Sequence, residues 1–405
     1  MSISMNRRAF SISTGAAVLM AGTVTRAGAQ EASPAADGAP GLPPLPEGAV
    51  VVAEGLWNPR FLAFADDGTL YVTEVGIGGD EPFVFGPPPG EASPVAEPVV
   101  EGTPAAEEAV EGGATRGYTG QISAIAPDGT VTVPVSGLPS YSDGVGPHGI
   151  TLQDGIVYFT VGGTAVLAGV EPLEGENNVF SFDPTTGTVT PIADFNIPEV
   201  EDNPDGTDVN PNLYGIAAGR SDGRLTVVDA GGNTVYSLDA ATGDIQLRAV
   251  VPTLDVLMPD AGYEARQPVP TAVVYHNGGA QVSLLSEFWP EDAPSVVKID
   301  GDGAFATLTP QAVGLSFVTG LASGPDGSLY VSQLFDDPEG APVGTIFRVL
   351  PDMSVEPVVE GLVMPHGITF DGDGNLYVTV YTLMSGPDMP AGAVVRIDGI
   401  AAPSA

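Results

Sequence analysis

The chain has 405 residues, of which 51 are acidic and only 12 are basic, so its formal net charge is −39 at pH 7. This charge argues against nucleic acid or an anionic membrane as a partner, because both need a basic protein face. Hydrophobic residues make up 43% of the chain, enough for a core, and the absence of cysteine excludes disulfides, lipid attachment through cysteine and thiol chemistry.

Residues 1–29 have the pattern of an export signal. Arg7 and Arg8 precede the apolar run "AAVLMAGTV", and "AGA" before Gln30 fits a cleavage site. The arginine pair, with Phe10 two residues further on, is typical of the twin-arginine route. The alternative is an ordinary Sec signal in which the arginines stand by chance. Either route predicts an exported protein, periplasmic or extracellular.

Three further segments have the composition of connections rather than core. Residues 30–47 are rich in proline and alanine and predict a flexible leader, and residues 79–117 predict a long acidic surface loop. Residues 401–405 form a short tail. No later apolar run is long enough to span a membrane, so we expect no membrane anchor, and we expect a monomer.

Residues 48–400 contain six copies of one unit. Each copy opens with a short apolar strand, as in "NPRFLAF", "GPHGITL" and "MPHGITF", and turns through a Gly-containing pair into a second strand, as in "DDGTLYVTE" and "GDGNLYVTV". A third strand follows, as in "NVFSFDPTTGT", and a fourth precedes the next unit. Equivalent positions are 88, 66, 57, 48 and 47 residues apart, and a four-stranded propeller blade needs about 40 to 50 residues.

The two ends of the repeat predict how the ring closes. A fourth strand precedes the first unit as "GAVVVAEGL" (Gly48–Leu56), and none follows the sixth third strand, "AVVRIDGI". The N-terminal strand would therefore complete the last blade and cover its edge. The sequence predicts an all-β, single-domain, six-bladed β-propeller. A β-sandwich, the main rival, does not explain six copies in phase.

Several segments, taken in order, resemble the ScyD/ScyE family of exported propeller proteins. They are "EGLWNPRFLAFADDGTLYVTEVGIGGD", "TGQISAIAPDGT", "NPDGTDVNPNLYGI", "VVDAGGNTVYSLD" and "GPDGSLYVSQL". The resemblance runs from about Val51 to Asp398 and implies an exported, NHL-like propeller, but no defined activity. The loop 79–117 departs from the family pattern because it is longer and has no cysteine.

One position at the start of each first strand would face the central channel, where propellers usually bind ligands. Around the ring it is occupied by Arg60, His148, Tyr214, Thr271, Thr319 and His366. Blade six neighbours blade one, so His366, Arg60 and His148 are consecutive. We expect Arg60, His148, Tyr214 and His366 to bind a carboxylate, phenolate or enolate ligand, with His148 or His366 as the proton-transfer group of an enzyme. The alternative is that both histidines are structural.

A second set of candidates stands at the ends of the second strands. Glu74, Asp229 and Glu287 would ligate Ca²⁺ or another divalent cation, or they would cap backbone amides. The segment Glu201–Asn212 has oxygen ligands at alternating spacing but departs from the helical calcium loop, and a rigid Asx-turn connection is the alternative.

Three functions are compatible with these features. The first is a binding or accessory scaffold for a small molecule or protein at the channel face. The second is a lyase or isomerase that uses a histidine as base, and the third is a metal-dependent lactonase. The channel ring offers Arg, His, Tyr and Thr where a gluconolactonase has Glu, Asn and Asp, which counts against the lactonase.

Overall fold

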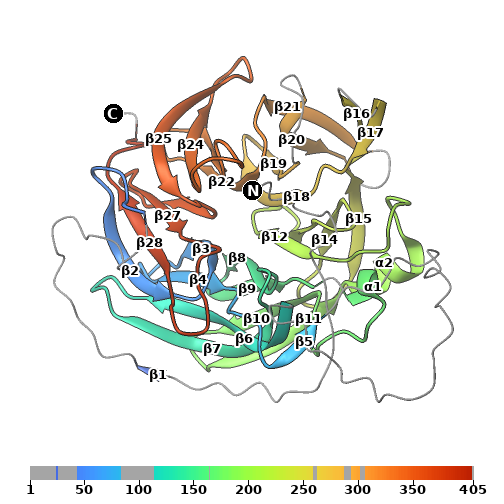
Figure 1. Cartoon of the computed structure of the whole chain (residues 1–405), viewed down its shortest axis with the longest axis horizontal. Coiled ribbons are helices and arrows are strands. Elements are labelled where there is room, and N and C mark those ends of the chain that lie inside the picture. The colour runs from blue at the N-terminus through green and yellow to red at the C-terminus, as the bar shows by residue number, and fades with distance from the viewer. Residues whose placement is uncertain are drawn as a thin grey trace, which may run out of the picture.

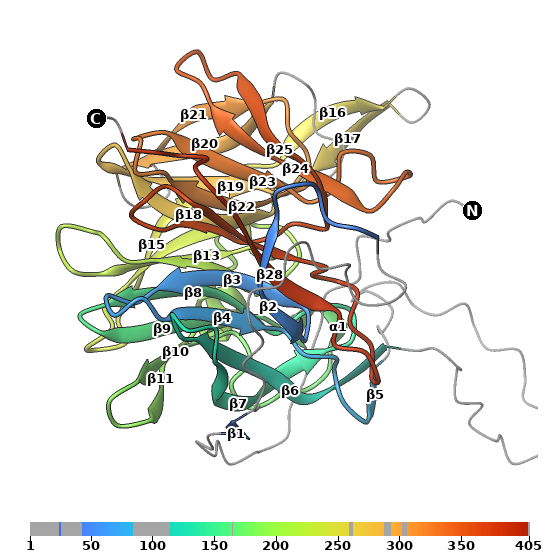
Figure 2. The ribbon, with the colours of Figure 1, turned by 90° about the vertical axis from the view of Figure 1, so that its left-hand side faces the viewer.

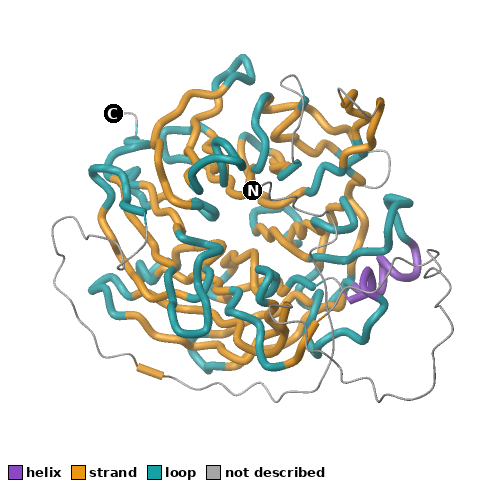
Figure 3. Tube along the Cα trace, viewed as in Figure 1, coloured by secondary structure: helices purple, strands orange, loops and turns teal. Residues whose placement is uncertain are grey.

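The computed structural model describes residues 24–25, 43–83, 114–163, 165–258, 262–286, 293–301 and 306–403. Within them the strands form six four-stranded antiparallel blades arranged around a central axis (Figure 1). The side view in Figure 2 shows the sheets fanning out around that axis, and Figure 3 shows that loops join strands throughout the ring. The predicted six-bladed propeller is confirmed.

The first three blades are built as follows. Blade one consists of β3 (Pro59–Phe64), β4 (Leu70–Glu74), β6 (Ala114–Ile125) and β7 (Val131–Tyr141), with β1 (Val24–Thr25) beside β7 and β5 (Glu81–Phe83) beside β6. Blade two consists of β8 (Pro147–Gln153), β9 (Ile156–Val161), β10 (Asn178–Asp183) and β11 (Thr188–Asp194). Blade three consists of β12 (Leu213–Ala217), β13 (Leu225–Asp229), β14 (Thr234–Leu238) and β15 (Ile245–Val250).

The last three blades complete the ring. Blade four consists of β18 (Pro270–His276), β19 (Gly279–Leu284), β20 (Pro294–Asp300) and β21 (Thr307–Val313). Blade five consists of β22 (Val318–Ser323), β23 (Leu329–Gln333), β24 (Val343–Val349) and β25 (Val355–Val363). Blade six consists of β26 (Ile368–Phe370), β27 (Leu376–Val380), β28 (Gly392–Ile397) and β2 (Val50–Leu56).

The N-terminal strand closes the ring as predicted. β2 pairs antiparallel with β28, with Val51 opposite Val395 and Leu56 opposite Gly392. An apolar cluster at this closure joins Leu62 of blade one to Val394 of blade six. The five other pairs of neighbouring blades have apolar clusters of their own, so the core is divided among six interfaces.

The insertions between blades explain the uneven spacing of the repeat. Helix α1 (Ala165–Ala168) is inserted between β9 and β10 of blade two, and helix α2 (Asn196–Asp202) lies in the connection from blade two to blade three. A hairpin of β16 (Leu254–Met258) and β17 (Gly262–Arg266) separates blades three and four. Neither the helices nor this hairpin follow from the repeat.

Two predicted segment boundaries are narrower in the structure. The loop expected at 79–117 begins and ends in a β-ladder, because β5 pairs with the first residues of β6, and residues 84–113 lie outside the described part. In the expected leader, Leu45 packs on the core of blade six and the Pro43 carbonyl accepts a hydrogen bond from Tyr381 Oη at 2.8 Å. The export signal lies outside the described residues apart from β1. Among the described residues, no helix is long and apolar enough to cross a membrane.

Candidate functional site

The glycine that follows the channel position in four blades is required by packing. A Cβ on Gly149 would collide with the carbonyl oxygen of Tyr214 in the next blade, and one on Gly367 would collide with that of Arg60. A Cβ on Gly215 would collide with the carbonyl oxygen of Thr271, and one on Gly320 would collide with that of His366. The repeated glycine therefore brings neighbouring inner strands into backbone contact around the axis.

Threonines on the second strands tie the same positions together. Thr160 Oγ1 accepts the amide of Gly149 at 2.8 Å and donates to the Tyr214 carbonyl at 2.6 Å. Thr379 Oγ1 accepts the amide of Gly367 at 2.9 Å and donates to the Arg60 carbonyl at 2.6 Å. These hydrogen bonds hold the backbone in place at the channel positions, and therefore fix where each channel side chain is attached.

Three aromatic side chains from three blades meet at the centre of the ring. The Tyr214 hydroxyl and His366 Nε2 are hydrogen-bonded at 2.6 Å, and the His148 ring stacks on the Tyr214 ring with centroids 4.1 Å apart. Phe61 packs edge-on against Tyr214 and His366. The exposed fractions of His148, Tyr214 and His366 are 0%, 9% and 3%. The predicted set is therefore brought together, but it fills the channel rather than lining an open mouth.

Arg60 is a buried cation without a carboxylate partner. Its Nη2 donates to the Gly144 carbonyl at 2.9 Å, and its Nη1 donates to the Thr382 carbonyl. The side chain is 2% exposed, and in the described part of the chain it forms no ion pair. Burial lowers the pKa of the Arg60 guanidinium. Carbonyl dipoles satisfy some of its hydrogen bonds but leave its charge uncompensated.

Both channel histidines are held neutral. Burial lowers the pKa of His148 well below 6.5, and the positive charge of Arg60 lowers it further. The same two causes, in the same order, lower the pKa of His366, and His148 adds a third contribution. Burial is therefore the larger cause for both histidines, and the charge of Arg60 adds to it.

Several buried polar atoms around this cluster have no hydrogen-bond partner. They are Arg60 Nε, both ring nitrogens of His148, His366 Nδ1 and Asn212 Oδ1. Asn212 Oδ1 lies beside the His148 ring, because a Cβ built on Gly162 would be 2.5 Å from this oxygen and 2.7 Å from His148 Cδ2. Unpartnered buried polar atoms are uncommon in folded proteins, and their concentration here marks the site.

Two residues near this cluster were missed by sequence reasoning. Asn212 comes two residues before Tyr214 and was considered only as part of a calcium-loop pattern. Asp143 precedes Gly144, whose carbonyl binds Arg60, and neither Asp143 carboxylate oxygen has a partner. Burial raises the pKa of Asp143 to about 7. The sequence signal that could have identified Asp143 is its place in "SDGVGPHG", shortly before the channel position His148.

The channel positions of blades four and five are structural. Thr271 Oγ1 donates to the Val318 carbonyl at 2.9 Å, and Thr319 Oγ1 donates to the Pro365 carbonyl at 3.3 Å. Both hydroxyls thereby link one blade to the next. The unsatisfied polar atoms of the channel cluster come from the other four blades, which are blades six, one, two and three.

The carboxylates at the ends of the second strands cap backbone amides. Glu74 Oε2 accepts the Trp57 amide at 2.6 Å and its Oε1 accepts Gln121 Nε2 at 2.9 Å. Asp229 Oδ1 accepts the amides of Asn212, Gly231 and Gly232. Glu287 lies outside the described residues. Glu74 and Asp229 thus serve separate blades, and within the described ranges no three His, Cys, Asp or Glu side chains are placed to hold a metal ion.

The segment Glu201–Asn212 contains an Asx turn, as the alternative interpretation predicted. Asp205 Oδ1 accepts the Thr207 amide at 2.9 Å. The segment begins inside α2, whose C-cap residue Asn203 has a left-handed backbone with φ of 39°. It is therefore a helix end followed by a turn rather than a calcium loop.

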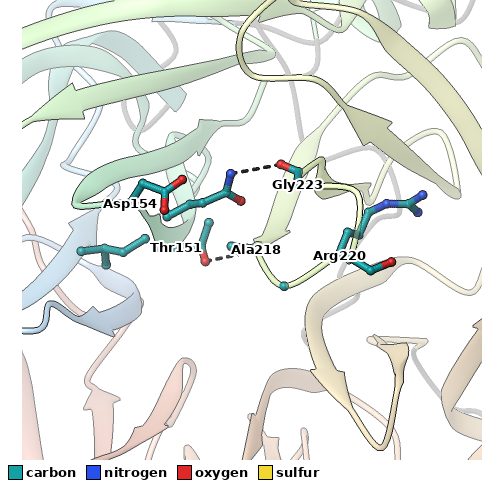
Figure 4. Close-up of a pocket in the computed structure, with 9 residues that line it drawn as sticks. Thr151, Asp154, Ala218, Arg220 and Gly223 are labelled. Carbon is teal, nitrogen blue, oxygen red and sulfur yellow. Dashed lines mark hydrogen bonds between the residues drawn. The ribbon is translucent and has the colours of Figure 1, made fainter.

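A groove lies at the end of the inner strands opposite to the channel positions, and its polar groups are already paired (Figure 4). It lies between the β8–β9 and β12–β13 turns and is lined by Thr151, Leu152, Gln153, Asp154, Ala218, Gly219, Arg220, Ser221 and Gly223. Its polar groups bind one another, since Gln153 Nε2 donates to the Gly223 carbonyl at 3.0 Å and Ala218 donates to Thr151 Oγ1 at 3.2 Å (Figure 4). Arg220 is engaged by Asp222.

Comparisons with known proteins support the propeller fold but do not indicate a function. No protein-family model and no curated protein sequence matches the chain. Among solved structures, it is similar to a putative oxidoreductase (glucose dehydrogenase) from Thermus thermophilus, with 17% identity, a TM-score of 0.50, and coverage of 86% of this chain and 98% of that one.

Two other solved structures have lower scores. Virginiamycin B lyase from Staphylococcus aureus has 15% identity and a TM-score of 0.45, with coverage of 85% of this chain and 96% of the lyase. A protein of unknown function from Bacteroides thetaiotaomicron has 14% identity and a TM-score of 0.48, with coverage of 86% and 71%. At these identities the similarity concerns the propeller fold alone.

Proposed function

We propose that the protein is an exported, ScyD/ScyE-like propeller that binds a small carboxylate, phenolate or enolate ligand at the channel face, in a binding or accessory role. The observation that carries the proposal is the buried Arg60 guanidinium, which forms no ion pair with a carboxylate among the described residues of a chain of net charge −39. A buried charge without a counter-ion costs several kcal/mol, and an anionic ligand would offset that cost.

The groups around Arg60 fit this ligand class. The unpartnered nitrogens of His148 and Nδ1 of His366 would donate to anionic oxygens once protonated, and Asn212 Oδ1 would accept a hydroxyl of the ligand. Leu383 lies over the guanidinium, since a Cβ on Gly144 would be 2.9 Å from Arg60 Nη2 and 3.0 Å from Leu383 Cδ2. Ligand entry would therefore move the β27–β28 loop.

NMR titration of the three histidines with a panel of carboxylates and phenolates tests the proposal. We expect ligand binding to shift the His148 and His366 signals and to raise the pKa of both, so affinity should increase as the pH falls below about 6.5. Arg60→Met should weaken binding about tenfold or more, because a buried charge-assisted hydrogen bond contributes about 1.5 kcal/mol or more.

Two controls separate binding from packing. His276 is the last residue of β18, and its Nδ1 and Ser323 Oγ are hydrogen-bonded at 2.9 Å, so its signal should not move. Arg396→Met removes an exposed arginine paired with Asp398 and should leave affinity unchanged. If no ligand shifts His148 or His366, or if His276 shifts equally, the cluster is only packing.

Proton-transfer catalysis of the lyase or isomerase type is a second candidate at the same site. It is favoured by His148, which is buried and neutral and has two unpartnered ring nitrogens, as a general base requires. Deuterium exchange at the α-carbon of a bound carboxylate would support it if the wild-type protein catalyses the exchange and His148→Gln does not.

Export is supported by the Arg7-Arg8 pair and the "AGA" cleavage pattern. N-terminal sequencing of the secreted chain checks this part, and a mature protein that starts at Gln30 is the expected result. A periplasmic or extracellular location would bring the channel face to soluble ligands or partner proteins outside the cytoplasm.

A further inference from the structure

A second group of unsatisfied oxygens lies between α2 and blade three, away from Arg60. The Phe195 ring packs edge-on against Tyr236 with centroids 5.4 Å apart, which anchors the start of α2 on β14. One turn later, Glu199 points inward, and its side chain is fully buried. It comes close to Asp229 at the end of β13.

Glu199 and Asp229 each have one free oxygen directed at the same point. A Cβ built on Gly232 would be 2.7 Å from Glu199 Oε2 and 3.3 Å from Asp229 Oδ2. Neither oxygen has a hydrogen-bond partner, although both side chains are 0% exposed. Their other oxygens are occupied by backbone amides, with Asn210 donating to Glu199 Oε1 at 3.4 Å. Gly232 thus leaves space that two carboxylates face.

Neutral oxygens on the neighbouring strand are unsatisfied as well. Thr234, 0% exposed, stands opposite Asp229 in the β13–β14 ladder, and its Oγ1 has no partner. Tyr236 lies two residues further along the same strand face, is 2% exposed, and its hydroxyl has no partner. Asn210 Oδ1 is also unpartnered. These hydroxyl and amide oxygens come from residues other than the two carboxylates and are of the kinds that complete the oxygen shell of a hard cation.

Burial and nearby carboxylates raise the pKa values of the titratable groups in this chamber. Burial, the charge of Asp229 and that of Asp205 raise the pKa of Glu199 to about 8. Burial raises the pKa of Asp229 to about 6 despite three amide donors. Burial and the charges of Asp229, Glu199 and Asp205 also raise the pKa of Tyr236, which places its hydroxyl in the field of these carboxylates. In the part of the chain that the structure describes, no Lys, Arg or His forms an ion pair with Glu199 or Asp229.

We infer that Glu199 and Asp229, with the neutral oxygens of Thr234, Tyr236 and Asn210, form a binding site for a hard divalent cation of the Ca²⁺ type. Ca²⁺ takes six to eight oxygen ligands at about 2.3–2.6 Å and tolerates mixed carboxylate, amide and hydroxyl sets with water completing the shell. This site is local to blade three and α2. It shares only Asp229 with the set expected from the sequence, which would have joined three different blades.

The inference is tested on the full mature chain after chelator treatment, by calorimetric titration with Ca²⁺ and by thermal unfolding with and without Ca²⁺. We expect one site per chain that binds more tightly than the diffuse acidic surface, together with a rise in Tm. Tb³⁺ luminescence displaced by Ca²⁺ gives a second readout, since Tyr236 would transfer energy to the bound ion.

Three variants and a control connect that site to these residues. Glu199→Gln should weaken Ca²⁺ binding about tenfold or more, because it removes a full charge from the ligand set. Gly232→Ala keeps both carboxylates but puts a methyl group between them and should abolish the tight site. Thr234→Val should have a smaller effect. Glu74→Gln changes the equivalent capping carboxylate of blade one and should leave the tight site intact.

Specific results would overturn the inference. A wild-type chain whose Tm and Ca²⁺ titration show only weak surface binding would mean that the chamber holds water alone. Glu199→Gln or Gly232→Ala with wild-type affinity would place any tight site elsewhere. Unfolding of a variant is detected by circular dichroism, and because the variants alter different atoms, a folded one still decides the question.

Discussion

The starts of β8 and of the inner strand of blade six carry the same tripeptide, Pro-His-Gly, in the same backbone setting. Gly149 and Gly367 each lie against the channel-position carbonyl of the next blade. Thr160 and Thr379 each bind that glycine amide and that carbonyl, with distances that agree within 0.1 Å. The two copies therefore share the glycine contact and the threonine hydrogen bonds.

The imidazoles of the two copies nevertheless have different surroundings. His366 Nε2 and the Tyr214 hydroxyl are hydrogen-bonded at 2.6 Å, whereas His148 stacks on the Tyr214 ring and both of its nitrogens are unpartnered. Tyr214 belongs to blade three, next to blade two but across the axis from blade six. The repeat therefore determines where a side chain starts, and the residue it meets across the ring determines its chemistry.

Deleting Gly48–Leu56 is the strongest way to break the comparison, because it removes β2 from the blade of His366 and leaves the blade of His148 complete. The deletion exposes β28 and removes the buried side chains of Ala53 and Leu56. At about 25 cal/mol per Å² of apolar area, we expect a loss of several kcal/mol. Hydrogen exchange should show amides of β27 and β28 losing protection before those of β9.

Deleting residues 30–42 is the control. This truncation keeps Leu45 on its apolar cluster and the Pro43 carbonyl bonded to Tyr381, so Tm should stay within a degree or two of the full mature chain. Equal Tm values for the two truncations would contradict closure by β2.

The fold could be predicted because its signals are local. The Asp-Gly and Asn-Gly hairpins recur in phase, and Gly68, Gly155, Gly223, Gly278, Gly327 and Gly374 all have the positive φ that such turns require. Closure followed from counting strands at the two ends. Neither inference needed information on which side chains meet.

The candidate site could be predicted only in part, because it depends on contacts across the ring. The repeat placed His148, Arg60 and His366 in neighbouring blades, but it did not indicate how deeply their side chains are buried in the channel. The hydrogen bond between His366 and Tyr214 joins residues 152 positions apart, so the repeat could not predict it. Glu199 was out of reach for a different reason. It lies in α2, an insertion outside the repeat, so the repeat pattern gave no position for Glu199 relative to Asp229.

Thr160→Val and Thr379→Val test whether the shared scaffold is equally important in the two copies. Each change replaces a buried hydroxyl with a methyl of similar shape and removes the hydroxyl's hydrogen bonds to a glycine amide and to the carbonyl of the next blade. We expect both to lower the free energy of unfolding by about 1–3 kcal/mol and by similar amounts, measured by urea denaturation. Thr307→Val, at an exposed position of β21, is the matched control and should change little. A large effect in one copy only would mean that the two strand starts are not equivalent.

The smallest effects at neutral pH, and the sharpest on the comparison itself, come from His148→Gln and His366→Gln. At pH 7.5 we expect His366→Gln to lower the free energy of unfolding by about 1 kcal/mol, because it disrupts the hydrogen bond to Tyr214. His148→Gln should lower it less, because no hydrogen bond is lost.

Burial lowers the pKa of both histidines in the folded state, so below about 6.5 the unfolded chain binds more protons and the wild-type protein loses stability as the pH falls. Each histidine contributes up to about 1.4 kcal/mol per pH unit to that loss, and each glutamine variant should remove its share. Urea denaturation at pH 7.5, 6 and 5 measures both effects. If either variant keeps the full wild-type loss between pH 6 and pH 5, that histidine is not held neutral by burial, and the two copies differ more than their common backbone indicates.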